Sequence, residues 1–135
     1  METLPSPSST DNVPEKDREK IKRYSFKGFR ILVGLNALSN ETIVSKHDHP
    51  RCLWFHAWGA SGAHVILCLG FDKGVTTSPN EVDMSAKRYA ASLAVKFSDR
   101  SSKQVSFSPL EDVYKPQGSR VGVFRTWRTE RIEIA

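Results

Sequence analysis

Two histidines offer the clearest chemistry in this chain. His56 and His64 stand in neighbouring apolar runs with seven residues between them. An imidazole changes charge near neutral pH, so a convergent pair can bind phosphate, bind a metal or transfer protons. A two-histidine phosphoesterase needs a hydroxyl residue two places after each histidine, whereas Trp58 and Ile66 occupy those places. We therefore expect the pair to bond backbone carbonyls and order the loop, or to contact a ligand, without catalysis.

A metal centre is the next chemistry to consider, because His47, His49, Cys52 and His56 are crowded in the sequence. Zinc takes four ligands in a tetrahedron, usually as two well-spaced pairs. The rings of His47 and His49 would point apart at a helix end, and Cys68 is better suited to the core. The glycines of residues 59–62 match neither a Walker loop nor a dinucleotide fingerprint. We predict no metal, no cofactor and no small-molecule substrate.

A basic and aromatic segment near the C-terminus offers contacts for nucleic acid. It begins with a loop that holds two cations and a small residue, as phosphate contacts require. It continues with a tryptophan between arginines, which is either a base-stacking platform or an anchor for a partner protein. The residues are Lys115, Gly118, Arg120, Arg125, Trp127 and Arg128. The alternative is a solvated face with Trp127 folded over the core.

The overall charge agrees with a polyanionic partner without proving one. The chain has 135 residues, a net charge of +5 and a pI of 9.4. Residues 1–25 hold five basic and five acidic side chains, so the whole excess lies in residues 26–135. No apolar run is long enough to span a membrane, and the N-terminus lacks a targeting pattern. We expect a cytoplasmic protein with Cys52 and Cys68 reduced and buried.

The pattern predicts a charged, disordered tail over residues 1–23 and one folded domain over residues 24–135. Arg30 to Val33 should form a buried strand that ends at Gly34. A short helix should run from a cap at Ser39 or Asn40 to His47. Two strands should follow, over residues 53–58 and 64–69.

The clearest helix signal lies in the second half of the chain. Ser78, Pro79 and Glu81 supply a cap, and apolar residues recur at helical spacing to Phe97. A strand at residues 105–107 and a closing hairpin of residues 121–127 and 131–134 should follow. The core-facing hairpin residues should be Val121, Val123, Ile132 and Ile134. We predict an α+β (mixed α/β) domain, in which a mixed or antiparallel sheet packs against one long and one short helix.

Five short motifs in this order resemble the NFACT-R domain, the predicted RNA-binding module of ribosome quality control proteins. They are Arg30-Ile31-Leu32-Val33-Gly34-x-Asn36 with Asn40-Glu41, Lys46-His47 before Leu53-Trp54-Phe55-His56, Gly62-Ala63-His64-Val65, the alanine-rich stretch to Phe97-Ser98, and Lys115-Pro116-x-Gly118 with Gly122. The resemblance covers about residues 29–134. The family's NFACT-N domain, helix-hairpin-helix and coiled coil are not found in the chain, so we expect RNA binding without the tailing activity.

The resemblance implies a non-enzymatic module that binds tRNA or rRNA, with the large ribosomal subunit as a further partner. The basic residues listed above would contact phosphates, and Lys46, His56 and His64 would shape the adjoining surface. DNA binding is one alternative, because stand-alone relatives are linked to DNA sensing. Docking on a ribosome-associated protein through Trp58 and Trp127 is another.

Overall fold

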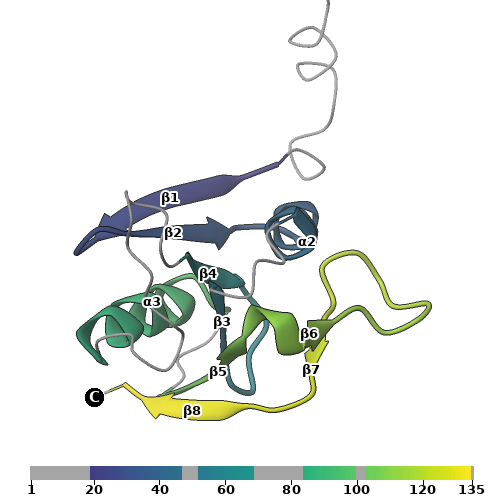
Figure 1. Cartoon of the computed structure of the whole chain (residues 1–135). Coiled ribbons are helices and arrows are strands. Elements are labelled where there is room, and N and C mark those ends of the chain that lie inside the picture. The colour runs from purple at the N-terminus through teal and green to yellow at the C-terminus, as the bar shows by residue number, and fades with distance from the viewer. Residues whose placement is uncertain (1–18, 47–51, 69–83, 100–102, 135) are drawn as a thin grey trace, which may run out of the picture.

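The structure is a computed structural model and describes residues 19–46, 52–68, 84–99 and 103–134. A six-stranded antiparallel sheet has the order β1-β2-β4-β3-β5-β8. The elements are β1 (Ile21–Phe26), β2 (Phe29–Gly34), α2 (Ala37–Lys46), β3 (Cys52–Ala57), β4 (Val65–Cys68), α3 (Met84–Lys96), β5 (Gln104–Pro109), a 3-10 turn (Leu110–Asp112), β6 (Val113–Tyr114), β7 (Arg125–Thr126) and β8 (Glu130–Glu133) (Figure 1). The predicted α+β fold, with an antiparallel sheet and two helices, is confirmed.

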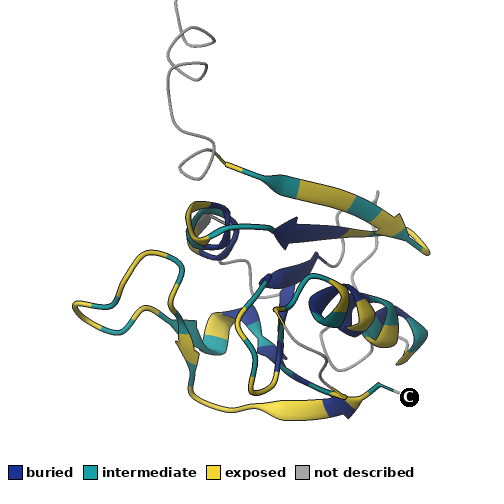
Figure 2. Ribbon diagram, turned by 180° about the vertical axis from the view of Figure 1, so that it is seen from behind, coloured by how far each residue is buried: buried dark blue, intermediate teal, exposed yellow. Residues whose placement is uncertain are grey.

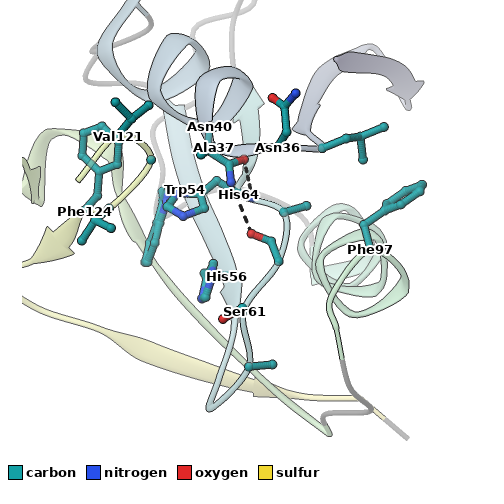
Figure 3. A pocket seen from close by; sticks show the side chains of 16 residues that line it. Asn36, Ala37, Asn40, Trp54, His56, Ser61, His64, Phe97, Val121 and Phe124 are labelled. Carbon is teal, nitrogen blue, oxygen red and sulfur yellow. Dashed lines mark hydrogen bonds between the residues drawn. The ribbon is translucent and has the colours of Figure 1, made fainter. Parts of the chain in front are cut away.

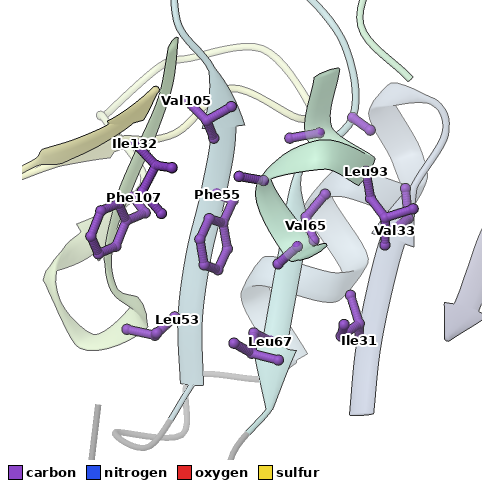
Figure 4. Close-up of a cluster of buried hydrophobic side chains, with 14 of the residues drawn as sticks. Ile31, Val33, Leu53, Phe55, Val65, Leu67, Leu93, Val105, Phe107 and Ile132 are labelled. Atoms are coloured by element: carbon purple, nitrogen blue, oxygen red, sulfur yellow. The ribbon is translucent and has the colours of Figure 1, made fainter. Parts of the chain in front are cut away.

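One face of the sheet packs against α3. Side chains alternate along a strand, so Leu53, Phe55 and Ala57 of β3 point to the same face, and all three are buried. Leu53 and Phe55 join a cluster that spans the central strands (Figure 4). Ala86 and Ala90 of α3 are fully buried in it, as expected for small residues that let a helix lie close to a sheet.

The other face packs against α2 and the 3-10 turn. Leu32 and Trp54 point to this side, and they pack in a second cluster with Ile43 and Val44 of α2 and with Leu110. The two helices therefore lie on opposite faces of the sheet. His56 follows Trp54 by two residues and so faces the α2 side as well. No described helix is long and apolar enough to cross a membrane.

The N-terminal half differs from the prediction in two places. Residues 21–23, assigned to the tail, form the first part of β1 and pair with β2. The cap of α2 is not Ser39 or Asn40, which are both buried within the helix. Asn36 is the cap instead, because its Oδ1 accepts the backbone N–H of Ser39 at 2.8 Å. The predicted cap of α3 at Ser78 lies outside the described residues.

The predicted closing hairpin is wrong. β7 pairs with β6, whereas β8 pairs with β5 at the edge of the main sheet. Val121 and Val123 are 55% and 42% exposed, so they do not belong to the core. The apolar alternation suggested a strand here, but Gly118 and Gly122 have φ of 76° and 85° and turn the chain instead. The buried position of Ile132 is as predicted.

Cys52 and Cys68 should be unreactive in the folded protein. They are partners across β3 and β4, are free thiols, and are 0% and 1% exposed. A side-chain hydrogen bond with Cys52, together with burial, raises the pKa of the Cys68 thiol. Since only the thiolate reacts, we expect a thiol reagent such as DTNB to label both cysteines only after unfolding.

Ser92→Cys provides the control for this labelling, because Ser92 is exposed on α3. The added thiol should react at the rate of a free thiol while the two native thiols stay unmodified. Reaction of all three at similar rates would contradict the buried cross-strand arrangement.

Candidate functional site

A pocket of about 490 Å³ is lined by residues of both clusters. Its walls come from the start of α2, from β3, from the β3–β4 connection (residues 58–64), from Phe97 and from residues 121–124 (Figure 3). His56 and His64 both line it, so the convergence of the two histidines expected from the sequence is present in the structure.

His64 is fixed on both its backbone and its ring. Its backbone N–H donates to Asn40 Oδ1 at 3.0 Å, and its Nδ1 accepts the indole N–H of Trp54, also at 3.0 Å. The predicted hydrogen bond from this ring to a backbone carbonyl is therefore replaced by a bond from an indole. These two contacts fix the orientation of the His64 ring, together with its burial, since His64 is only 5% exposed.

The two histidines are part of an aromatic wall. The ring of His56 stacks on Trp54 with centroids 5.9 Å apart, and it meets His64 edge-on at 4.8 Å. Phe124 also meets His64 edge-on, at 6.0 Å. Such packing of four rings leaves little freedom for rotamer change.

Both imidazoles are held neutral. Burial, followed by the electrostatic effects of the nearby His56 and Lys115 side chains, lowers the pKa of His64 to about 3. Burial also lowers the pKa of His56, against weaker opposing effects of the Ala57 backbone and Asp99. Desolvation disfavours the charged form of a base, which explains the direction of both shifts. Neither ring is therefore a preformed cation for phosphate.

Asn40 ties α2 to the β3–β4 connection. Besides accepting from His64, its Nδ2 donates to the carbonyl of Gly62 at 3.3 Å. The position of Asn40 requires a glycine at residue 34. A Cβ there would lie 2.9 Å from the backbone nitrogen of Asn40 and nearer still to its Oδ1. The middle of the connection is held by the residues that follow α3, since Ser61 N–H donates to Asp99 Oδ1 and the Ser61 carbonyl accepts the Asp99 N–H.

Glu41 ties α2 to the loop of residues 115–124. Its Oε1 accepts the backbone N–H of Gly122 at 2.7 Å and pairs with Lys115 Nζ at 2.8 Å. Lys115 also donates to the carbonyls of Arg120 and Val123. The hydrogen bonds from Lys115 and Gly122 lower the pKa of Glu41, although burial opposes them as the largest single effect. We call these contacts of Glu41, Lys115 and Gly122 the loop clamp.

The remaining basic residues of the predicted site lie outside the pocket on an exposed edge (Figure 2). Arg120 and Arg125 are exposed, and within the described chain no residue pairs with their guanidinium groups. Arg128 pairs with Asp112 at 3.2 Å but stays 79% exposed. Gly118 lies at an exposed turn of the loop.

Trp127 does not fold back over the core. It is 71% exposed, and its indole stacks on Tyr114 with centroids 4.4 Å apart and an interplanar angle of 23°. We call this pair the Trp127 platform. The structure thus divides the predicted residues into a neutral pocket and an exposed basic edge, joined by the loop clamp.

Sequence reasoning missed the residues that build the pocket. Asn40 was predicted only as a possible helix cap, and Glu41 and Trp54 appeared only within the family-like motifs, without a role for their side chains. The signal available in the sequence was the adjacent polar pair Asn40 and Glu41 on a short helix, because buried polar side chains need hydrogen-bond partners. Lys46 ends α2 and its side chain is not described, so its predicted role stays a prediction. In the described part of the chain no three His, Cys, Asp or Glu residues form a metal-binding group, and His47 and His49 lie outside that part.

Gly122→Ala should destabilise the protein more than Gly118→Ala. Both positions have positive φ, 85° and 76°, which costs an alanine about 1–2 kcal/mol. A methyl group at 122 would also lie 2.9 Å from the backbone of Ala37, whereas one at 118 meets nothing within 4 Å. We expect Gly122→Ala to lower the free energy of unfolding, measured with urea, by at least about 1 kcal/mol more than Gly118→Ala does. Equal losses of stability would mean that the loop can move away from α2 without an energetic cost.

The free energy of unfolding should fall in acid because His64 is held neutral. The unfolded chain binds a proton there near the ordinary pKa of 6.5, whereas the folded chain does so only near 3. This contribution is fully present above pH 6.5 and is lost as the pH falls towards 3. Between about pH 7 and pH 4.5, His64 alone should cost about 2–3 kcal/mol of stability in urea unfolding.

His64→Asn is the matched control for the acid effect. The asparagine Oδ1 still offers an acceptor to Trp54, but the amide does not titrate. The variant should be less stable at neutral pH, and its stability should depend less on pH by about the same 2–3 kcal/mol. Identical pH profiles for the two proteins would exclude His64 as the source.

Known proteins resemble the chain over most of its length. The Streptococcus suis protein named Rqc2 homolog RqcH is 34% identical over 119 residues, which are 84% of this chain and 20% of that protein. The Bacillus subtilis protein of the same name is 30% identical over 101 residues, which are 73% of this chain and 16% of that protein. The chain therefore spans about a fifth or less of these curated relatives. No family model matches it.

A solved structure shares the fold. The C-terminal part of the fibronectin/fibrinogen-binding protein from Streptococcus suis matches with a TM-score of 0.72 and 29% identity, over 92% of this chain and 49% of that one. The resemblance predicted from the sequence is thereby confirmed, and the chain is similar to the C-terminal module of NFACT proteins.

Proposed function

We propose that the chain is an RNA-binding module with a ribosome-associated role in quality control. Its ligand is tRNA or rRNA, the large ribosomal subunit is a further partner, and the protein works in the cytoplasm without catalysis of its own. The relationship to the Rqc2 homologues supports the ribosome-associated role. The observation that carries RNA binding is the Trp127 platform with Arg125 beside it.

The Trp127 platform has the features of a base-stacking surface. An aromatic face that is already stacked on one side loses little freedom when a base covers the other side. Tyr114 supplies that support, and 71% of the Trp127 surface stays open. Arg125 pairs across the strands with Tyr114 and places a cation beside the platform. Stacking with adjacent phosphate contacts is how proteins bind unpaired RNA.

The histidines support binding better than catalysis. A general base works best with a pKa near the operating pH, whereas the pKa of His64 lies near 3. Its Nδ1 is also occupied by Trp54. These two observations are the basis for proposing a non-enzymatic module.

Protein docking is the second candidate. Trp58, Val121, Val123 and Trp127 are large apolar side chains that are 42% to 71% exposed, and aromatic anchors of this kind are common in interfaces. The structural neighbour is described as fibronectin/fibrinogen-binding. DNA binding has no such observation in its favour.

Labelled tRNA should bind the chain more tightly than a matched DNA duplex in fluorescence-anisotropy titrations at two salt concentrations. We expect Arg120→Ala/Arg125→Ala to weaken tRNA binding and to reduce the salt slope by roughly 1 per lost phosphate contact. Trp127→Ala should weaken binding about tenfold, because one stacked base is lost.

Arg88→Ala/Lys96→Ala is the charge-matched control, since both residues are exposed on α3. This variant should lose much less affinity than the loop variant. Equal losses would show a non-specific charge effect. No salt-sensitive binding to tRNA would refute the RNA function and favour docking to a protein.

A further inference from the structure

One buried donor in the pocket has no acceptor among the described residues. Trp54 Nε1–H can only donate, so Nδ1 of His64 is the acceptor and the neutral ring carries its proton on Nε2. Across the described chain no residue accepts a hydrogen bond from this Nε2–H. A buried donor without an acceptor destabilises the folded chain. A ligand that brings an acceptor to His64 therefore gains affinity from it.

The pocket favours an uncharged ligand. Its lining side chains are apolar, aromatic, hydroxyl or amide groups, and both histidines are held neutral. Lys115 is the nearby cation, but the loop clamp already pairs it with Glu41 and two carbonyls. A phosphate here would be buried without a partner charge, which is costly. The groups that bind phosphate lie outside, on the exposed edge.

The size and wall of the pocket suit a flat ring. A volume of about 490 Å³ lies within the usual range for pockets that bind small organic groups. The rings of Trp54, His56 and Phe124 surround His64, and the amide of Asn40 is committed to protein contacts. Aromatic faces with one directed donor match a nucleobase, which has both a π-face and ring acceptors.

The pocket wall and the exposed basic edge meet along the chain. Residues 121–124 line the pocket, and the residues that flank this stretch, Arg120 and Arg125, are exposed. A nucleotide whose base enters the pocket therefore leaves its phosphates near these two arginines.

We propose that the pocket beside His64 receives one unpaired nucleobase of the bound RNA. This inference rests on the proposed RNA-binding function and adds a site of selection to it. His64 Nε2–H donates to a ring or carbonyl acceptor of the base, and the aromatic wall packs against its faces. A base in a duplex is stacked and paired, so the pocket selects loops, bulges and ends.

Side-chain NMR of the indole N–H groups tests the proposal on the whole chain. The three tryptophans give separate signals, and only the Trp54 indole bonds to His64 in the pocket. We expect millimolar adenosine, guanosine, cytidine or uridine to shift the Trp54 signal. Inorganic phosphate and ribose 5-phosphate should leave it unchanged, with Trp58 as the internal reference, because nucleosides can also stack on the Trp127 platform.

Two variants test the proposed nucleobase pocket through RNA binding. His64→Asn removes the Nε2–H donor but keeps an acceptor for Trp54, and Val121→Trp adds bulk at the exposed rim without touching the core. Each should weaken binding to a single-stranded RNA about tenfold and leave the weaker binding to a matched RNA duplex unchanged. Val121→Trp keeps the test valid if His64→Asn does not fold.

The outcomes separate this proposal from the RNA function. If tRNA binds but no nucleoside shifts the Trp54 signal and Val121→Trp has no effect, the nucleobase site is refuted and RNA binding stands. If nucleosides shift Trp54 but no RNA binds, the RNA function fails while the pocket keeps its ligand class. A Trp54 shift with phosphate alone would overturn the proposal in favour of an anion site.

Discussion

The bridge made by the Asn40 side chain is the interaction on which the pocket depends. Its amide joins α2 to the β3–β4 connection by accepting from the backbone of His64 and donating to Gly62. Asn40 is only 7% exposed, and a buried amide that loses its partners is costly. The position of His64, and with it the bond to Trp54, therefore follows from a polar contact rather than from apolar packing.

The next helix residue holds the opposite wall. Glu41 belongs to the same turn of α2 and carries the loop clamp, so one helical turn fixes both the β3–β4 connection and the loop of residues 115–124. The glycines fit this arrangement, because Gly34 and Gly122 are where the chain approaches α2 too closely for a Cβ. Motifs that are far apart in the sequence thus meet at one short helix (Figure 3).

The sequence predicted the parts of the molecule that follow from periodicity. Alternation placed Leu53, Phe55 and Ala57 in the core, and the alanines of α3 were expected to lie against the sheet. Alternation failed at Val121 and Val123, where two glycines with positive φ turn the chain out of the sheet. The convergence of His56 and His64 was predictable from their flanking strands. The bond between Trp54 and His64 was not, because it depends on side-chain directions that no local pattern specifies.

The separation of charge from the pocket has a consequence for any polyanion. Cations on an exposed edge attract phosphates over a distance and are weakened by salt, but they carry no information about the base. The neutral pocket contributes little to attraction, and its contacts depend on the shape and hydrogen-bonding groups of what enters it. A protonated imidazole would place a cation in the pocket, so the low pKa of His64 keeps the pocket neutral while the cations lie on the exposed edge. Burial of one histidine thus determines the charge of the pocket.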